Sequence, residues 1–303
     1  MQVINSLSEF HRLLSVAPPM HPLISVVHVS ELHAVASDVW KKFTTNFYSI
    51  SLKNNIQSKI KYGQNYYDFD RGTMTFTAPK QVQSVEVDEA NSYNNKSGNG
   101  YVLMFHPDFL GKNPLAINIK HYSFFSYSVN EALHLSEREE ENVIAIFKKI
   151  EEEYQHIDNH TQNVILAQID LLLQYSARFY ERQFITRKVV NHDLLTKTES
   201  MIESYFKNEL GVENGVLTVE YLASQLNLSS NYLSDALRSL TGQGAQQHIH
   251  EKMIEKAKEY LTASNLSVSE IAYNLGFERP QSFNKLFKNK TEMSPLAFRE
   301  SFN

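Results

Sequence analysis

The feature of this sequence that most constrains its fold is a repeat in the last third of the chain. The stretches Val219–Gly242 and Val268–Thr291 share one pattern: a short apolar helix, a sharp turn and an amphipathic second helix. The period is roughly fifty residues, far shorter than the chain. The matching positions, first stretch then second, are Leu222-Ala223 and Ile271-Ala272; Leu226-Asn227-Leu228 and Leu275-Gly276-Phe277; Leu233, Ala236, Leu237 and Phe283, Leu286, Phe287.

Each element of the repeated pattern has a physical reason. A small alanine on the first helix lets the second helix cross closely. Four residues later the chain must turn sharply, and Asn227 and Gly276 are residue types that tolerate a positive φ. A bulky apolar residue then fills the corner, and the next helix carries apolar residues at i, i+3 and i+4, which buries one stripe and leaves the other face free. The pattern therefore predicts two helix-turn-helix units in tandem.

The free face of each second helix is polar. Between Arg279 and Lys290 the sequence has four basic residues and no acidic one. Gln281 and Asn284 can bond base edges, and Lys285 can reach guanine. The first unit offers Asn231, Ser234, Asp235 and Arg238. Asp235 would repel phosphate, and it either accepts from a cytosine amine or caps its neighbours.

Two helical hairpins in an ordinary bundle are the structural alternative. One pattern alone would leave that alternative open. Two patterns in register, the second with a basic face, favour a module that lays its second helices in the major groove of DNA. The formal net charge of −5 is no obstacle, because only the contacting face has to neutralise phosphates.

The C-terminal region, roughly 194–303, resembles the DNA-binding domain of the AraC/XylS family of bacterial transcription activators. The residues that carry the resemblance are Ala257-Lys258, Ile271-Ala272, Gly276-Phe277, Phe283, Phe287-Lys288, Ser294-Pro295 and Phe298-Arg299. The resemblance implies that a long helix, here about Ala245 to Leu261, joins the two units. The sequence departs from the family pattern at two positions. Glu292 stands where glycine is usual, which puts the local turn in doubt, and Met253 stands where a basic residue is common.

The resemblance also implies which side chains meet DNA. The base-facing positions fall on Asn231, Ser234, Asp235, Gln281, Asn284 and Lys285. The expected phosphate contacts are Arg238, Ser282, Lys288 and Lys290.

The first part of the chain, up to about Pro107, is predicted to be mostly extended. Short runs rich in Val, Ile, Thr, Tyr and Phe alternate with turn residues, which suggests a sandwich or barrel. The candidate strands are Leu23–Leu32, Phe47–Leu52, Ile56–Tyr62, Thr73–Thr77, Ser84–Val87 and Tyr101–Phe105. Members of the resembled family often carry a cupin-like β-barrel that senses a small molecule, so the expected fold class is α+β, with such a barrel in residues 1–135.

Two long helices are predicted after the strands. Ser136 and Glu139 have the spacing of a capping box, and apolar residues follow at helical spacing. The second helix, about Thr161 to Glu181, is so apolar that we expect either a dimerisation surface or core of its own domain. The helical pair is assigned to residues 136–188, with a linker near Val189 to Asp193. The basic stretch Arg178, Arg182, Arg187 and Lys188 is either a hinge near DNA or a solvated helix end.

Catalytic chemistry finds little support in the sequence. The chain has 303 residues and no cysteine, which excludes disulfides and thiol nucleophiles. The histidines of the first half show no close His-x-His pair; they are His11, His21, His28, His33, His106 and His121. We expect no catalytic residue, no metal and no cofactor. An aromatic set either lines a ligand pocket or forms core: Tyr62, Tyr66, Tyr67, Phe69, Phe76 and Tyr101.

The sequence therefore predicts a cytoplasmic, homodimeric, sequence-specific regulator of transcription. Its expected partners are double-stranded DNA, RNA polymerase and a small-molecule effector; no membrane partner is expected. Activation is the expected mode, because the resembled family mostly activates. Two alternatives stay open: a metal-dependent cupin enzyme with an accessory DNA-binding tail, and a ligand-independent regulator whose barrel is a scaffold.

Overall fold

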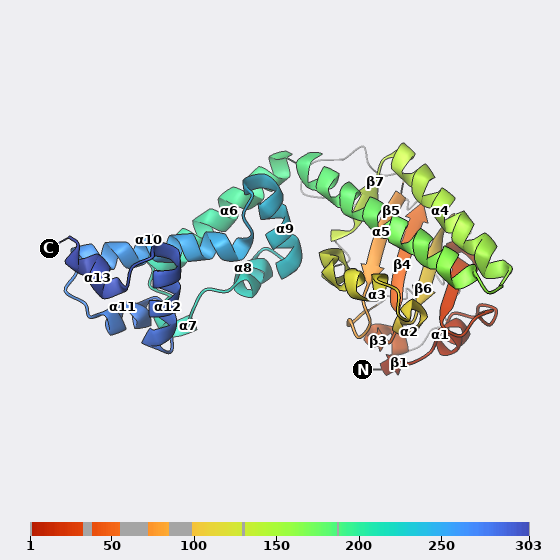
Figure 1. Cartoon of the computed structure of the whole chain (residues 1–303), viewed down its shortest axis with the longest axis horizontal. Helices are drawn as coiled ribbons and strands as arrows, with labels where there is room; N and C mark the ends of the chain where they lie inside the picture. The colour runs from red at the N-terminus through yellow and green to blue at the C-terminus, as the bar shows by residue number, and fades with distance from the viewer. Residues whose placement is uncertain are drawn as a thin grey trace. The chain divides into compact units, whose positions relative to one another are not determined.

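The computed structural model describes residues 2–32, 38–54, 72–84, 99–128, 131–186 and 188–302. The chain divides into two compact units, Met1–Gln183 and Phe184–Asn303 (Figure 1). The first unit is β-rich with helices, and the second is all-helical. In the described part of the chain, no helix combines the length and apolar character needed to cross a bilayer.

A five-stranded antiparallel sheet is the centre of the first unit. Its strand order is β2 (Ile24–His28), β6 (Asn99–Phe105), β4 (Tyr48–Asn54), β5 (Gly72–Thr77) and β7 (Leu133–Leu135). A second, two-stranded sheet pairs β1 (Gln2–Ile4) with β3 (Phe43–Thr45) in parallel. The short helices of this unit are α1 (Leu7–Leu13), η1 (Val29–Glu31), η2 (Asp38–Lys41), α2 (Pro107–Leu110), α3 (Leu115–Asn118), η4 (Ile119–His121) and η5 (Ser123–Ser126).

The expected cupin-like barrel is not seen among the described strands. β2 and β7 are the two ends of the five-stranded order and do not pair with each other, so the sheet is open in the described residues. Candidate strand Ile56–Tyr62 lies outside the described residues, as does all but the first residue of Ser84–Val87. Short alternating runs predict strands, whereas closure depends on which edges pair over long sequence distances, and the local pattern does not contain that information.

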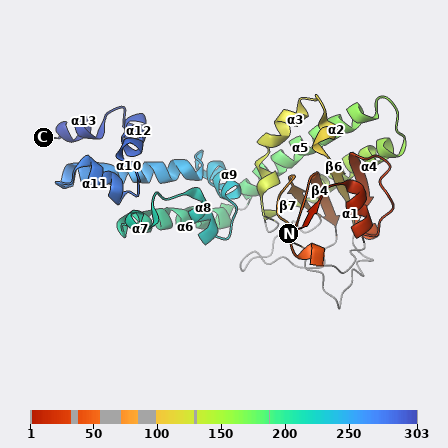
Figure 2. The same ribbon diagram turned by 90° about the horizontal axis from the view of Figure 1, so that it is seen from below.

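Alternation along the strands gives the large sheet two different faces. Ile50 lies opposite Leu103 and Leu52 opposite Tyr101, and their side chains are buried on the face covered by two long helices. These helices are α4 (Glu137–Gln155) and α5 (Thr161–Thr186) (Figures 1 and 2). The ring of Tyr101 stacks on Phe147 of α4 with 5.2 Å between ring centres. The other face packs partly against α1 and the segment around Trp40 and Phe43.

The two long helices begin and pack as parts of this unit. Ser136 and Glu139 form the predicted capping box, with the Ser136 backbone nitrogen donating to Glu139 Oε2 at 2.8 Å. The predicted apolar positions of α5 are buried within the unit, apart from half-buried Val164; they include Ile165, Leu166, Ile169, Leu172, Leu173 and Phe179. Core packing therefore accounts for the apolar character that had also suggested a dimerisation surface.

The second unit starts earlier than the sequence suggested. Helix α6 (Lys188–Lys207) covers the predicted linker near Val189 to Asp193, so that linker prediction is wrong. Leu194 and Leu195 pack on the core of the second unit, and this packing outweighs the weak helix propensity of the β-branched and short polar residues before them. The remaining helices are α7 (Gly211–Asn214), α8 (Val219–Gln225), α9 (Ser230–Thr241), α10 (Ala245–Ala263), α11 (Val268–Asn274), α12 (Pro280–Thr291) and α13 (Pro295–Glu300).

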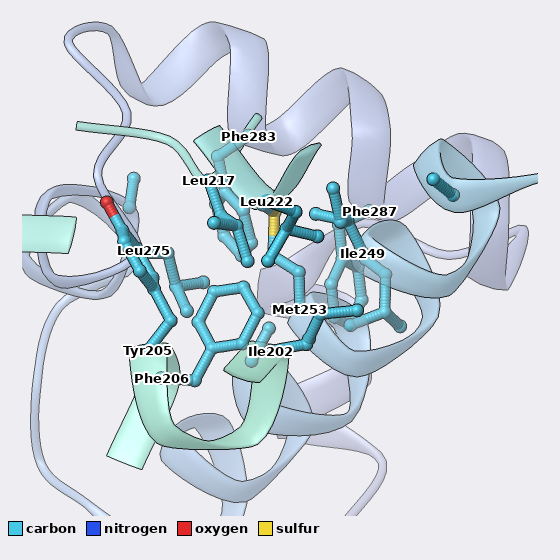
Figure 3. Packing of buried hydrophobic residues seen from close by; sticks show 14 of the residues in the cluster. Ile202, Tyr205, Phe206, Leu217, Leu222, Ile249, Met253, Leu275, Phe283 and Phe287 are labelled. Carbon is cyan, nitrogen blue, oxygen red and sulfur yellow. The ribbon is translucent and has the colours of Figure 1, made fainter. Parts of the chain in front are cut away.

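One hydrophobic core joins both helix-turn-helix units. Helix α10, the predicted connecting helix, runs beside α6 (Figures 1 and 2). Met253 and Ile249 of α10 lie between Leu222 of the first helix-turn-helix repeat and Phe287 of the second repeat (Figure 3). Phe206 of α6 belongs to the same cluster. The two units are therefore held by a shared core as well as by the chain that connects them.

Candidate nucleic-acid interface

The turn of each helix-turn-helix unit has the predicted conformation. Asn227 has a φ of 55° and Gly276 a φ of 91°, the positive values expected at these two positions. The next residue closes each turn in the same way: Leu228 N donates to Ala223 O, and Phe277 N donates to Ala272 O, both at 2.9 Å. Both alanines are buried at the helix crossing. The repeat in the sequence is thus a repeat in backbone geometry.

The second turn is also packed against another loop of the unit. A Cβ placed on Gly276 would overlap the carbonyl oxygen of Gly215, which precedes α8. That carbonyl also accepts a hydrogen bond from the Tyr205 hydroxyl of α6 at 3.0 Å. Two structural features therefore require glycine at position 276, the positive φ and the close approach of the Gly215 backbone.

The ends of the two recognition helices, α9 and α12, are also equivalent. Gly242 ends α9 with a φ of 80°, and Glu292 ends α12 with a φ of 64°. Their backbone nitrogens donate to Arg238 O and Lys288 O respectively, each at 2.8 Å. Glu292 therefore adopts the left-handed conformation in which glycine is usual, so the departure at this position leaves the turn unchanged. Met253, the other departure, is fully buried in the core, where a basic residue could not be accommodated without a partner.

Helix α12 presents a continuous polar face. Phe283 and Phe287 are fully buried, which fixes the rotation of the helix on its unit. Gln281, Asn284, Lys285 and Lys288 are exposed and spaced at i, i+3, i+4 and i+7, so they lie along one side. Ser282 is exposed as well, beside this row. The structure thus brings together five of the six side chains assigned to this helix.

Lys290, the sixth, belongs to the last turn of α12 and acts on a different neighbour. It is exposed. Burial lowers the pKa of His250 on α10, and the positive charge of Lys290 lowers that pKa further. His250 Nε2 also lies 2.8 Å from the Gln246 amide nitrogen. Lys290 is therefore close to α10, away from the row that starts at Gln281.

The face of α9 differs in charge. Asn231 is exposed, whereas Ser234 and Asp235 are half-buried. Asp235 Oδ1 accepts a hydrogen bond from Arg238 Nη1 at 2.6 Å, one turn further along the helix. Two roles were considered for Asp235, accepting from a cytosine amine or interacting with neighbouring side chains. The structure contains the second, the bond to Arg238. Arg238, expected at phosphate, has its guanidinium in that ion pair.

Arg299 has a structural role that the sequence pattern did not assign. Its Nε donates to Leu261 O at 3.1 Å, and its Nη2 donates to Leu266 O at 2.6 Å. These bonds tie α13 to the end of α10 and to the segment that precedes α11. The adjacent pair Phe298-Arg299 in the sequence is the signal that could have suggested it, since Phe298 packs on the same core.

Arg182 is neither part of a hinge near DNA nor a solvated residue of a helix end, the two roles considered for the basic stretch. Its guanidinium bonds Glu139 through Nε at 3.0 Å and Nη2 at 2.6 Å, and Nη2 also donates to His134 O at 2.7 Å. Arg178 is exposed. The stretch is therefore anchored to the first unit at Arg182; Arg187 and the side chain of Lys188 lie outside the described residues.

The histidines and aromatic residues of the first unit are dispersed among structural roles. His11 is buried and its Nε2 lies 2.7 Å from Ser25 Oγ, and His28 Nε2 lies 2.8 Å from Glu151 Oε1. Among the described residues no group of three or more His, Asp or Glu side chains is placed to hold a metal ion. Of the six aromatic candidates, Phe76 lines a cavity and Tyr101 is core. Tyr62, Tyr66, Tyr67, Phe69 and His33 lie outside the described residues.

Comparisons with known proteins identify a helix-turn-helix domain in the chain. A family profile described as "Helix-turn-helix domain" matches residues 222–301. The regulatory protein PocR of Salmonella typhimurium is 29% identical over 119 residues, which is 39% of this chain and 37% of PocR. The transcriptional activator RhaS of Klebsiella pneumoniae is 23% identical over 164 residues, 54% of this chain and 56% of RhaS.

One of the solved structures that the chain resembles is a bacterial regulator. A probable AraC family transcriptional regulator from Rhodopseudomonas palustris aligns with a TM-score of 0.31 and 17% identity, over 37% of this chain and 98% of that chain. The chain spans only part of the curated relatives it matches, 37% of PocR and 56% of RhaS. The domain type of the first unit is not identified by these matches.

Proposed function

The C-terminal unit is the helix-turn-helix domain of an AraC-family regulator, and from this premise we propose that the chain regulates transcription by reading two neighbouring major-groove segments of a specific DNA site. The observation that carries the proposal is the exposed row on α12. A helix whose aromatic side is locked into a core and whose free side carries two amides and two lysines fits the requirements of base-edge and phosphate recognition.

In this proposal the two recognition helices contribute unequally. Gln281, Asn284 and Lys285 read bases, and Ser282, Lys288 and Lys290 contact phosphates. In the first helix-turn-helix repeat, Asn231 and Ser234 read bases, with Asp235 beside them. The ion pair of Asp235 with Arg238 supports a role of this helix in register and selectivity more than in affinity, because a neutralised pair attracts phosphate weakly.

The whole chain is proposed to act as an activator that contacts RNA polymerase and responds to a small molecule held by the first unit. The expectation of a homodimer stays with the proposal on the strength of the family resemblance. The promoters occupied in cells, mapped by chromatin immunoprecipitation, would identify the regulated genes, and reporter expression with and without the gene for this protein would give the sign of regulation.

The base-reading assignment is tested by gel shift on an operator found in that way. We expect Q281A/K285A to weaken binding by about 10- to 100-fold, since a good base contact is worth about 1–3 kcal/mol. K207A, which removes an exposed lysine from α6, serves as the matched control and should bind like the native protein. Unchanged affinity in the double variant would contradict the assignment.

A further inference from the structure

A cavity of about 610 Å³ lies in the first unit, on the face of the sheet opposite α4, and Tyr180 near the end of α5 contributes to its lining. Cavities of roughly 300–1,000 Å³ are the size that holds small organic ligands in proteins. The cavity is enclosed by the sheet, by the segment that contains Trp40 and Phe43, and by the region of Phe124 and Tyr127. It is separate from the helix-turn-helix unit, and its lining is entirely within residues 1–183.

The floor of the cavity is a patch of short polar side chains. Ser49, Ser51 and Lys53 alternate along β4 and so point to one face. Thr77 lies opposite Ser49 and Thr75 opposite Ser51 in the neighbouring strand, on the same face. Because these hydroxyl side chains are short, the space above them is not filled by the sheet itself. The floor offers hydrogen bonds, while the aromatic residues around it offer apolar contact.

Lys53 is the single charged side chain among the described residues that line the cavity. It stands at the end of the hydroxyl row, opposite Thr73 of β5 and Gly100 of β6. Within the described part of the chain, no carboxylate is within ion-pair distance of it. The side chain of Lys53 is exposed to solvent, and partial burial by its neighbours lowers its pKa. An ammonium group in this position is stabilised by a negative charge that the described lining does not provide.

We propose that this cavity binds a monocarboxylate with an aromatic or aliphatic body, its carboxylate paired with Lys53 and the adjacent hydroxyls. The body of the ligand lies against Trp40 and Phe124, where apolar area is removed from water. This inference rests on the proposed function, because it names the chemical class of the effector. A cationic ligand would meet Lys53 with no described acidic residue in the lining to balance it.

The chain carries its own reporter for the experiment. Trp40 is the single tryptophan of the sequence, and it lines the cavity. Its fluorescence can therefore follow titration of the full-length protein with phenylacetate and with octanoate. The uncharged amides phenylacetamide and octanamide have nearly the same shape, and a neutral polyol such as glycerol tests whether the hydroxyl row alone suffices.

We expect each carboxylate to bind the native protein at least about tenfold more tightly than its amide, the preference typical of a charge-assisted hydrogen bond. K53M should abolish the preference and K53R should restore it. K112M is the matched control, because Lys112 is exposed and does not line the cavity. Carboxylate affinity should fall as the pH rises toward the pKa of Lys53, which burial holds below the ordinary value of a lysine.

Equal binding of acid and amide to the native protein would overturn the inference, and so would an unchanged preference in K53M or the absence of any response of Trp40 to millimolar carboxylate. The comparison of acid with amide uses the native protein, so it holds even if K53M folds poorly. Gel shift of the same samples separates this inference from the proposed function. If the protein binds operator DNA but not the carboxylates, only the proposed ligand class is wrong. If the native protein does not bind DNA, the proposed function as a regulator is wrong.

Discussion

At the scale of single residues, glycine and its substitutes set the geometry of the helix-turn-helix units. Gly242, Gly276, Asn227 and Glu292 all have positive φ values, but their surroundings differ. Gly242 has no neighbour within 4 Å of where a Cβ would be, whereas at Gly276 a Cβ would overlap the Gly215 carbonyl. The two glycines therefore separate the cost of a strained backbone from the cost of a steric overlap.

Alanine at each of these two glycines measures that difference. We expect G242A to lower the free energy of unfolding of the second unit by about 1–2 kcal/mol, the cost of a left-handed residue with a Cβ. G276A adds an overlap worth about 1–3 kcal/mol, giving about 2–5 kcal/mol in total. Urea denaturation followed by far-ultraviolet circular dichroism measures both. Equal losses for the two variants would mean that the loop at Gly215 moves away freely.

The residue scale also shows what the sequence could predict. The positive φ values, the corner residues and the exposed side of α12 were predictable, because they follow from local rules of turn and helix. Lys53 was not singled out, although alternation from Ser49 and Ser51 placed it on the same strand face; the expected strand stopped at Leu52. The cavity above it could not be predicted, because its walls come from segments far apart in the chain.

At the scale of elements, the end of α5 completes an edge of the sheet. Among the described strands, β7 pairs with β5 alone. On the other side Gln183 accepts from His134 N at 2.8 Å and donates to Ala132 O at 3.2 Å. Arg182 donates to His134 O, so these two side chains take the place of a neighbouring strand. Tyr180 of the same helix lines the cavity, which connects α5 with both the sheet edge and the proposed ligand site.

Replacing Gln183 by methionine should destabilise the first unit. Q183M leaves the buried His134 N–H and the Ala132 carbonyl without this partner, and we expect a loss of about 2–6 kcal/mol in the free energy of unfolding, since each of the two groups costs about 1–3 kcal/mol. Trp40 fluorescence in urea reports this unit selectively, because the second unit has no tryptophan. Q174M, an exposed change on the same helix, should have little effect. A loss no larger than in Q174M would show that water replaces the amide.

At the scale of the whole molecule, the charge of the proposed DNA-binding face is opposite in sign to the net charge of the protein. The formal net charge is −5, yet the row on α12 is basic. The basic row attracts DNA phosphates, whereas the net negative charge of the whole protein repels them weakly. Salt screens both effects. The open arrangement of the described strands, in contrast, could not be predicted at this scale, because the closure of strands into a barrel is decided by pairing across the whole unit.

Salt dependence tests the phosphate contacts. Binding to the operator should weaken steeply with salt, and K288A/K290A should reduce the slope of log K against log salt by about 0.9 for each contact removed, or about 1.8 in all. K197A removes an exposed lysine of α6 and should leave the slope unchanged. A slope that is the same in the native protein and in the double variant would remove Lys288 and Lys290 from the interface.

The contact between Gly276 and Gly215 has a consequence for how the tandem module can be divided. The turn of the second repeat rests on the chain that leads into the first, and Met253 packs with both. Neither repeat has a complete hydrophobic core of its own. Although the sequence contains two copies of one pattern, deletion of either copy would expose the apolar surface of the other, so we expect the two repeats to fold, and to be retained or lost in evolution, only together.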